Sequence, residues 1–184
     1  PGRASRPLSA SAAGFVPSSG AGVLLLENLE DAESRGARIY GEVLGGDINC
    51  GGHRSGGSMT APNPEGVQRC IRAAVKDSGI EPEEIDVING HLTATGADSS
   101  EVVSWSKALG LGPENFPPIT STKSMIGHAL GAAGALEVVA SMLMLDGSFV
   151  HPSINCEDVH PKVEEFAGSI PHTVEELPQL STII

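Results

Sequence analysis

The 184-residue chain contains no uninterrupted apolar run of the length that a membrane-spanning helix needs. Such a helix takes about 18 or more apolar residues in succession, and charge, glycine or serine interrupts the longest candidates here. The chain also starts without an initiator methionine and without the apolar centre of a signal peptide. We therefore predict no membrane span, a cytoplasmic location and a chain that is one part of a longer protein.

Cysteine is scarce, and the three present, Cys50, Cys70 and Cys156, form no Cys-x-x-Cys pair. An odd and widely spaced set fits reduced thiols in a cytoplasm better than a disulfide framework. We therefore expect no disulfide.

Positive charge is also in short supply, with 11 Lys and Arg residues against 23 Asp and Glu and a formal net charge of −12. Nucleic-acid binding requires a basic surface, so this balance argues against a nucleic-acid partner. An acidic partner would have to meet a local basic patch. Arg69, Arg72 and Lys76 are candidates, because their spacing places them on one face of a predicted helix. This face is either a solvated surface or, together with Arg54, a docking site.

Aromatic residues make up only 3% of the chain, whereas 23 glycines are present. Such a core is built by close approach of backbones, which suits tightly layered helices and sheets. Apolar spacing, helix caps and turn residues predict a layered α/β fold, and they place the individual elements. The predicted strands are 23–26, 38–44, 85–89, 118–121, 154 and 183–184, and the first of them is expected to be buried on both faces. The predicted helices are 30–35, 63–78, 98–109 and 127–145. Asp98 is expected to cap the third helix.

Two histidines directly follow predicted strands. His91 comes after the strand at 85–89, and His128 comes after the strand at 118–121. Open α/β sheets form their ligand crevices at the carboxyl ends of strands. Either histidine could still be an ordinary core or surface residue. Their shared position favours a site, as does Lys123 five residues before His128.

The predicted helix at 127–145 begins with alanine and glycine, so its first turns carry almost no side chain. The free N–H groups and positive dipole at its amino end would bias a nearby imidazole toward the neutral form. A neutral His128 could then donate a hydrogen bond to a carbonyl without first being charged.

Five ordered motifs resemble those of beta-ketoacyl synthases, and the similarity as a whole runs from about residue 6 to the last residue. Residues 89–95, NGHLTAT, resemble the family's N-x-H-G-T-x-T motif, with Gly90 and Leu92 as variants. Residues 121–137, STKSMIGHALGAAGALE, are similar to its S-x-K-S-x-x-G-H-x-x-G-A-A-G-x-x-E signature. The other three motifs are 15–27, FVPSSGAGVLLLE, 59–66, MTAPNPEG, and 152–155, PSIN.

The resemblance implies the thiolase-like α/β fold, in which helix, sheet, helix, sheet and helix stack in layers. Residues 1–60 would form the end of the amino-terminal half plus a loop. Residues 61–184 would form most of the carboxy-terminal half, truncated before its last strand. Because both halves would be incomplete, we expect the chain to be stable only within a larger protein or with a partner.

The resemblance also implies decarboxylative Claisen condensation in fatty acid or polyketide synthesis. A cysteine holds an acyl chain, malonyl on an acyl carrier protein loses CO2, and the carbanion attacks the acyl thioester. His91 and His128 would stabilise the negative charge on the malonyl thioester oxygen. Lys123 would order the site, with Glu137 either as its charge partner or as an ordinary helix carboxylate. The supporting polar residues of the site would be Thr93 and Thr95.

The family's nucleophilic cysteine would lie upstream of this chain, and none of the three cysteines present fits its role. Cys70 should face a helix core, and Cys156 follows the PSIN segment. Cys50 lies in a glycine-rich loop whose sequence differs from that of the family's nucleophile turn. Ser18 and Ser19 also replace the family's usual Gly-Glu pair. We therefore predict an acyltransferase that is inactive as this isolated fragment.

The implied partners are an acyl carrier protein and malonyl and acyl thioesters. Because the carrier brings its own phosphopantetheine, the resemblance implies no cofactor and no metal on the chain itself. The chain would form a homodimer, or a heterodimer with another ketosynthase chain or with its missing segment. The patch of Arg69, Arg72, Lys76 and Arg54 is a candidate site for the acidic carrier. The alternative function is a non-catalytic, chain-length-factor-like subunit. Retention of both histidines and the lysine favours the enzyme, because a scaffold has no use for an enolate site.

The remaining histidines carry no expected role. His53 falls in a glycine-rich loop and is expected to be an ordinary loop residue. His151, His160 and His172 lie beside prolines in a polar tail, so we expect them to be solvated.

Overall fold

The computed structural model describes residues 2–51, 58 and 61–184 of the chain. Arg54, which was a candidate for the docking patch, and the loop residue His53 lie outside the described residues. The elements in chain order are α1 (Leu29–Ser34), α2 (Pro64–Ser78), η2 (Pro82–Glu84), β1 (Ile88–Asn89), α3 (Asp98–Leu109), β2 (Ile119–Thr120), α4 (Lys123–Ile126), η3 (Leu130–Ala132), α5 (Ala133–Gly147), β3 (Phe149–Val150), η4 (Pro161–Ser169) and β4 (Glu175–Glu176).

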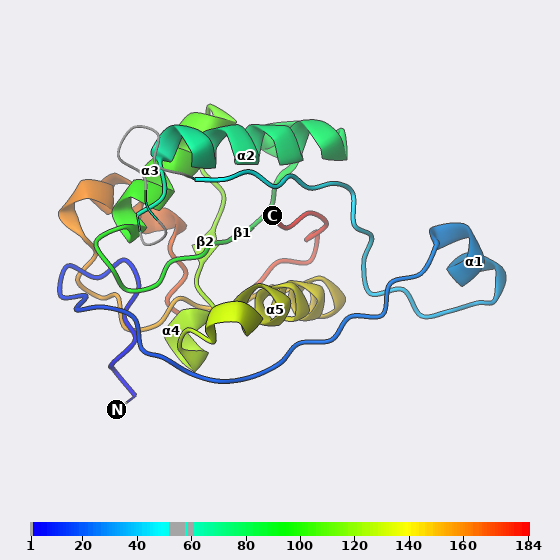
Figure 1. The fold of residues 1–184 in the computed structure, drawn as a ribbon, viewed down its shortest axis with the longest axis horizontal. Helices are drawn as coiled ribbons and strands as arrows, with labels where there is room; N and C mark the ends of the chain where they lie inside the picture. Colours follow the sequence, from blue (N-terminus) through cyan, green and yellow to red (C-terminus); the bar gives the residue numbers. More distant parts are fainter. Residues whose placement is uncertain (1, 52–57, 59–60) are drawn as a thin grey trace.

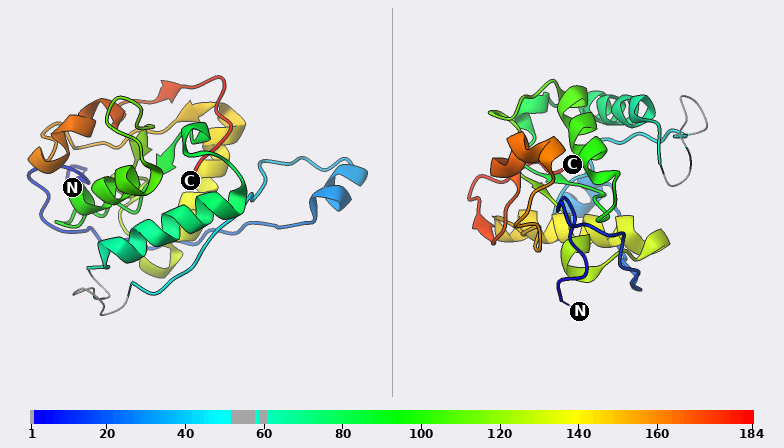
Figure 2. Two further views of the ribbon diagram at one scale, coloured as in Figure 1. Left: turned by 90° about the horizontal axis from the view of Figure 1, so that it is seen from above. Right: turned by 90° about the vertical axis from the view of Figure 1, so that its left-hand side faces the viewer.

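Helices lie on both sides of a short parallel pair of strands, β1 and β2 (Figure 1). Ile88 pairs with Ile119 in this ladder, and Val87 and Ile183 form one further parallel bridge. Helices α2 and α3 cover one side of the pair and α5 covers the other, an arrangement also visible in Figure 2. These three layers, helices, strand pair and helix, belong to the predicted α/β class and form part of the five-layer stack. The strands are shorter than predicted, because the described residues provide few neighbours to extend the ladders.

Helix α2 begins and ends where its sequence predicts. The Asn63 side chain accepts a hydrogen bond from the Glu65 N–H at 3.0 Å. Pro64 occupies the first helical position, where a missing N–H costs nothing. Gly79 ends the helix with φ 72°, a left-handed conformation that glycine adopts without a Cβ clash. Ile71 is buried and marks the face of the helix that packs on the core.

The main apolar core joins the strand pair to the α2–α3 layer. Ile88 and Ile119 at its centre are fully buried. The other buried members are Leu8, Ile71, Val75, Ile85, Leu92, Val102, Leu109, Leu111, Phe116, Cys156, Val163, Phe166 and Ile170. A smaller cluster of Val87, Met144, Val150 and Leu180 ties α5 to β3 and the carboxy-terminal segment. The two clusters thus hold the strand pair, and the loops that follow β1 and β2, between the α2–α3 layer and α5.

Residues 15–48 form an extended arm with α1 at its far end (Figure 2). The helix predicted at 30–35 is present as α1, but the strands predicted at 23–26 and 38–44 are wrong. No ladder forms in either segment, and Val23 and Leu25 are 89% and 90% exposed. A strand buried on both faces needs hydrogen-bonding neighbours at its edges and covering layers. The described residues supply neither to this arm.

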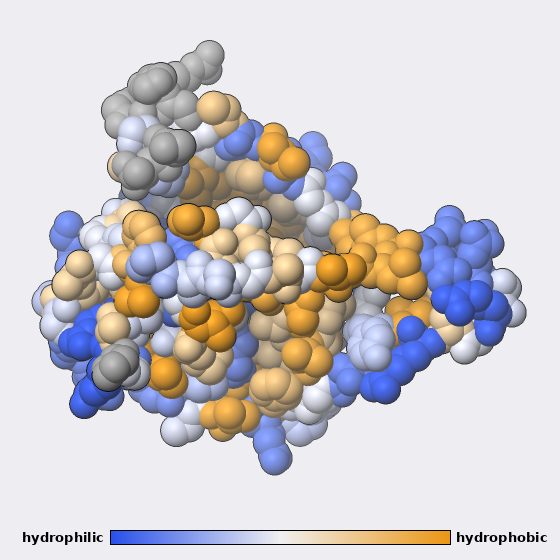
Figure 3. Space-filling model, turned by 60° about the horizontal axis from the view of Figure 1, so that its bottom comes forward, coloured by the Kyte–Doolittle hydropathy of each residue, from blue (hydrophilic) through white to orange (hydrophobic). Residues whose placement is uncertain are grey.

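The single helix predicted at 127–145 is wrong at its start. Helix α4 ends at Gly127, whose φ of 74° breaks the helical path, and the short η3 then leads into α5 at Ala133. Leu130–Gly147 is long and apolar enough, by length and composition alone, to cross a membrane, with 11% of it buried. Glu137 and Asp146 interrupt this segment, and core helices of other proteins have the same composition, so the prediction of no membrane span stays a prediction. Apolar side chains lie exposed on this side of the molecule (Figure 3).

Candidate active site

His91 and His128 lie next to each other beyond the carboxyl ends of β1 and β2. Their ring centroids are 5.2 Å apart and their planes are inclined at 83°. The ring of Phe15, from the start of the arm, packs edge-on against His128 with centroids 5.4 Å apart. Because β1 and β2 are parallel neighbours, the loops that follow them leave the sheet at the same edge. Two distant parts of the sequence meet there for that reason.

The arm also holds the backbone at His128. The His128 N–H donates to the Val16 carbonyl at 2.8 Å, and its own carbonyl accepts from the Ser18 N–H at 3.0 Å. Gly127 permits this approach, because a Cβ at that position would lie 2.8 Å from the Val16 carbonyl oxygen. Ser18, one of the two serines that replace the family's usual Gly-Glu pair, therefore contacts the site through its backbone.

A carboxylate that sequence reasoning missed holds the backbone at His91. Glu101, in the first turn of α3, accepts hydrogen bonds from the N–H groups of His91 at 2.6 Å and Leu92 at 3.0 Å. Burial raises the pKa of Glu101 to about 7, although these two N–H groups act in the opposite direction. Its spacing after the NGHLTAT motif, at the start of a helix, was the one available signal.

Asp98 has a larger role than the predicted helix cap, and the N-cap position itself is occupied by Ala97. The buried Asp98 carboxylate accepts hydrogen bonds from the N–H groups of Thr93 at 3.0 Å and Ala94 at 2.9 Å. Ala94 has φ 62°, a conformation that L residues rarely adopt, so these bonds stabilise a strained turn. The Thr93 and Thr95 hydroxyl groups lie 3.1 Å apart on the same turn, both half-buried.

Lys123 and Glu137 form an ion pair behind the two histidines. The side chains are 2% and 15% exposed, so the pair is largely removed from solvent. Burial raises the pKa of Glu137, and the ammonium of Lys123 opposes that shift. Removing one member of a buried pair typically costs about 3–5 kcal/mol, because the other charge is left without a partner. The pair therefore fixes the position of α5 relative to the loop that carries His128.

Both imidazoles are biased toward the neutral form. His91 as a whole residue is exposed at the surface, but desolvation of its ring by the surrounding groups lowers its pKa to about 4, and the charges of Lys123 and His128 add to the effect. Burial also lowers the pKa of His128, again with a contribution from Lys123. The expectation of neutral rings holds, but its predicted cause is wrong. Helix α5 begins only at Ala133, so burial and the lysine act in place of a helix dipole.

One imidazole nitrogen of the pair has no hydrogen-bond partner in the part of the chain that the structure describes. His128 Nδ1 is buried and makes no hydrogen bond with the described residues. Buried polar atoms are paired in most folded proteins, so an unpaired one at a site needs an explanation. Two neutral rings in contact can act as hydrogen-bond donors toward one oxygen on which negative charge develops.

The cysteines lie apart from the histidine pair. Cys156 is buried beside His172, at 3.8 Å from its Nδ1, and burial raises its pKa to about 11. Cys70 donates to the Asp47 carbonyl at 3.3 Å, and burial raises its pKa as well. Cys50 lies exposed in the segment before α2. A thiol nucleophile needs a lowered pKa, so neither shifted thiol is suited to that role. Within the described ranges, no group of three or more metal-binding side chains occurs.

The prediction that His151 is solvated is wrong. It is 6% exposed, its Nε2 lies 3.1 Å from the Thr122 hydroxyl, and its Nδ1 lies 3.1 Å from the Pro152 carbonyl. His160 caps η4 by accepting from the Lys162 N–H at 3.2 Å, and His172 is exposed. The polar composition of this segment suggested a solvated tail, but the segment folds back on the core and buries His151.

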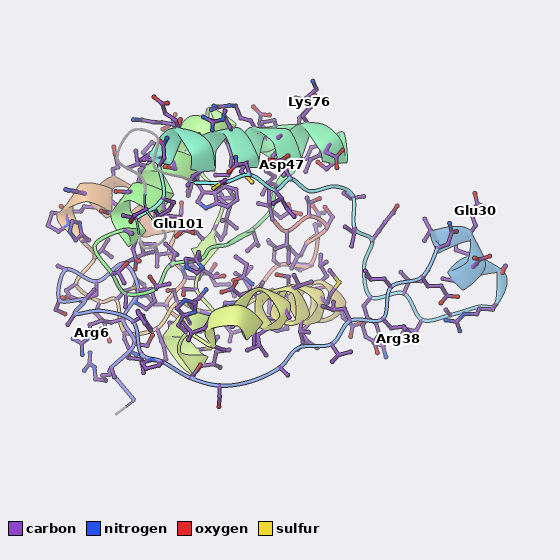
Figure 4. The ribbon with its side chains drawn as sticks, in the orientation of Figure 1. Arg6, Glu30, Arg38, Asp47, Lys76 and Glu101 are labelled. Atoms are coloured by element: carbon purple, nitrogen blue, oxygen red, sulfur yellow. The ribbon has the colours of Figure 1, made fainter. Side chains whose placement is uncertain are left out.

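Arg69, Arg72 and Lys76 are exposed on the outer face of α2. Lys76 extends away from the body of the molecule (Figure 4). Among the residues whose positions are described, none of the three takes part in an ion pair. The patch is therefore open to a partner on the side of the α2–α3 layer.

Comparison with known proteins gives one consistent result. The family described as "Beta-ketoacyl synthase, C-terminal domain" matches residues 40–157. Over 161 residues the chain is 47% identical to 3-oxoacyl-[acyl-carrier-protein] synthase II, chloroplastic, from Arabidopsis thaliana, covering 86% of the chain and 29% of that protein. Over 169 residues it is 40% identical to 3-oxoacyl-[acyl-carrier-protein] synthase 1 of Escherichia coli strain K12, covering 91% of the chain and 38% of that protein.

Solved structures agree with the sequence relatives. The ishigamide ketosynthase/chain length factor superposes with a TM-score of 0.84 at 38% identity, covering 94% of this chain and 41% of the other. AntDE:AntF, a type II polyketide acyl-carrier protein in complex with its ketosynthase, superposes with a TM-score of 0.84 at 35% identity. That match covers 96% of this chain and 42% of the other. The chain thus spans well under half the length of the proteins it resembles.

Proposed function

The chain belongs to the beta-ketoacyl synthase family, as a carboxy-terminal part with the thiolase-like fold, and on that premise we propose that it carries the decarboxylation site of a condensing enzyme. The observation that carries the proposal is the contact between the His91 and His128 rings, 5.2 Å apart between centroids. Two neutral donors at that separation suit one carbonyl oxygen that gains negative charge. The buried, unpaired His128 Nδ1 supports this assignment.

In the proposed reaction, malonyl on an acyl carrier protein loses its carboxylate as CO2. The electron pair of the broken carbon–carbon bond passes into an enolate, whose oxygen accepts hydrogen bonds from His91 and His128. The enolate carbon then attacks an acyl thioester, forms the new carbon–carbon bond and expels a cysteine thiolate. Each preorganised donor to such an oxyanion typically contributes about 3–4 kcal/mol.

The neighbouring residues take supporting roles in this proposal. Lys123 favours neutral imidazoles by its charge, and Glu137 neutralises that charge in turn. Thr93 and Thr95 provide hydroxyl groups on the turn that follows His91. No cofactor of the chain's own is required, because phosphopantetheine arrives on the carrier protein.

We propose that the nucleophilic cysteine comes from outside these 184 residues, so that the isolated chain is an inactive acyltransferase fragment. The raised pKa values of Cys70 and Cys156 support this view. The division into residues 1–60 and 61–184 remains a prediction. So do the dimeric state and the cytoplasmic location, and one relative is named as chloroplastic.

A second candidate is a chain-length-factor-like subunit without activity of its own. The similarity to a ketosynthase/chain length factor structure is the observation in its favour. The contact of two neutral imidazoles with a buried lysine–glutamate pair favours the enzyme, because a non-catalytic subunit needs no such site.

The test combines this chain with the cysteine-bearing amino-terminal part and measures CO2 release from malonyl on the carrier protein. We expect His91→Ala and His128→Ala each to lower the rate by about 10²–10³-fold, the cost of losing one oxyanion donor. His172→Ala, at an exposed histidine away from the pair, serves as the matched control. Release of CO2 at the wild-type rate by both site variants would exclude the proposed enzyme. A wild-type assembly without activity would support the non-catalytic subunit.

A further inference from the structure

Behind the candidate site lies a buried hydrogen-bond network that the proposed chemistry does not use. Its first member is His151, whose Nε2 lies 3.1 Å from the hydroxyl of Thr122, the residue before Lys123. The Thr122 hydroxyl lies 3.2 Å from Oδ1 of Asn89, two residues before His91. The network therefore touches both loops that carry the site.

The other end of the network is α5. Asn89 Nδ2 donates to the Glu137 carbonyl at 3.0 Å and to the Ser141 hydroxyl at 3.1 Å. Glu137 also holds Lys123 through its carboxylate. Three elements, β1, the β2 loop and α5, are thus joined through one amide and one hydroxyl.

The donors and acceptors can be assigned in only one order along this path. A carbonyl only accepts, so the amide nitrogen of Asn89 must face Glu137 and its oxygen must face Thr122. The single hydroxyl hydrogen of Thr122 is then used on Asn89. The contact between Thr122 and His151 therefore requires a hydrogen on Nε2 of the imidazole.

We propose that His151 is a positioning residue, whose Nε2–H starts a one-way hydrogen-bond chain through Thr122 and Asn89 to α5. These hydrogen bonds fix the segments leading to Lys123 and His91 relative to each other. The proposal rests on the proposed function, since it assigns a further residue to the same site. His151 itself makes no contact with the substrate in this role.

The second ring nitrogen competes for the same hydrogen. Nδ1 of His151 lies 3.1 Å from the Pro152 carbonyl, which can only accept. A neutral ring carries one hydrogen and serves one of the two contacts, whereas a cation would serve both. Burial lowers the pKa of His151 and so favours the neutral ring. The hydroxyl of Thr120, at 3.5 Å from Nε2, is too distant to replace Thr122 as the main partner.

The tautomer can be measured directly on the complete synthase, with the cysteine-bearing part present. Nitrogen-15 NMR distinguishes a protonated ring nitrogen from a bare one, and the His151→Phe variant identifies the signals by their loss. We expect the hydrogen of the neutral His151 ring to reside on Nε2. A hydrogen on Nδ1 at neutral pH would overturn the proposed series of hydrogen bonds.

Steady-state kinetics test whether the hydrogen bonds from His151 through Thr122 and Asn89 position the site. We expect His151→Phe to lower kcat for malonyl decarboxylation about tenfold, the effect of one lost hydrogen bond, with little change in KM. Thr122→Val should give a similar loss, and the double variant should lose no more than either single variant. The control is Ser153→Ala, whose buried hydroxyl makes no hydrogen bond with the described residues, and which should leave kcat unchanged.

Additive losses in the double variant, or an unchanged kcat in His151→Phe, would overturn the proposal. If His151→Phe does not fold, the tautomer of the wild-type ring still decides, with the signals assigned by selective labelling of histidine. An inactive wild-type synthase would refute the proposed function alone, because the NMR result does not depend on catalysis.

Discussion

Glu101 accepts a hydrogen bond from the backbone N–H of His91, and desolvation favours the uncharged form of both side chains. The pKa of His91 falls to about 4 and that of Glu101 rises to about 7. Lys123 strengthens the shift of the histidine and opposes that of the glutamate. At neutral pH the imidazole is therefore an uncharged donor, which is the state that enolate stabilisation requires.

We predict that the His91 ring titrates at about pH 4, measured by NMR on the complete synthase. Because this folded pKa lies below the ordinary 6.5, the unfolded chain binds more protons between the two values. The contribution of His91 to stability is therefore complete above pH 6.5 and is lost as the pH falls toward 4. Lys123→Met should raise the pKa only part of the way, since burial is the larger cause. A wild-type ring that titrates near 6.5 would contradict the prediction.

At the scale of elements, α2 has two distinct uses. One face carries Ile71 and Val75 into the core, and Arg69, Arg72 and Lys76 lie on the solvent-exposed part of the helix. In a chain with a net charge of −12, such a cluster is a local exception. An acidic carrier protein, as proposed above, would be attracted to this helix and repelled elsewhere.

We predict that Arg69→Glu with Arg72→Glu weakens carrier binding to the complete synthase about fivefold to thirtyfold at low salt, from ~0.5–1 kcal/mol for each exposed ion pair lost. The affinity of the variant should also depend less steeply on salt concentration than that of the wild type. Lys162→Glu, an exposed charge reversal on η4, is the matched control and should bind as the wild type does. Equal affinity and equal salt dependence in the α2 variant would show that the face is merely solvated.

For the molecule as a whole, the exposed apolar surface is the dominant feature. Val23, Leu25, Leu26 and Ile48 on the arm are each more than three-quarters exposed. Helix α5 adds Leu143 at 54% exposed, and Figure 3 shows apolar side chains across this side of the molecule. Exposed patches of this kind mark surfaces that another chain or segment covers. The chain spans 29–42% of the length of these relatives, and we expect the remaining part of such a protein to cover this surface.

We predict that residues 1–184 alone do not form a monomer that unfolds cooperatively, whereas co-expression with the remaining part of the synthase does restore one transition. Sedimentation and urea unfolding measure the two properties. Leu25→Ser with Leu26→Ser should reduce self-association of the isolated chain and weaken the complex, while Glu30→Ser on α1 should change neither. A stable monomer with a sharp transition and no binding of a hydrophobic dye would contradict this prediction.

The local parts of the fold were predictable from the sequence, because their partners are close along the chain. Asn63, Pro64 and Gly79 define α2 through contacts within one or two turns. The family and the thiolase-like α/β fold were also identified from ordered motifs, and the comparisons confirm both. His91 and His128 could be named as candidates because each follows a strand, and parallel neighbours bring such positions together.

Other features depend on which distant segments share one place, and only the tertiary structure decided them. Glu101 accepts from the backbone of His91, although its place in a predicted helix does not indicate that role. His151 is buried against Thr122, although its polar segment predicted a solvated side chain. The apolar run at 23–26 likewise has the composition of a buried strand, yet a strand also requires neighbours. Composition determines what a segment can bury, while burial itself depends on the surrounding layers.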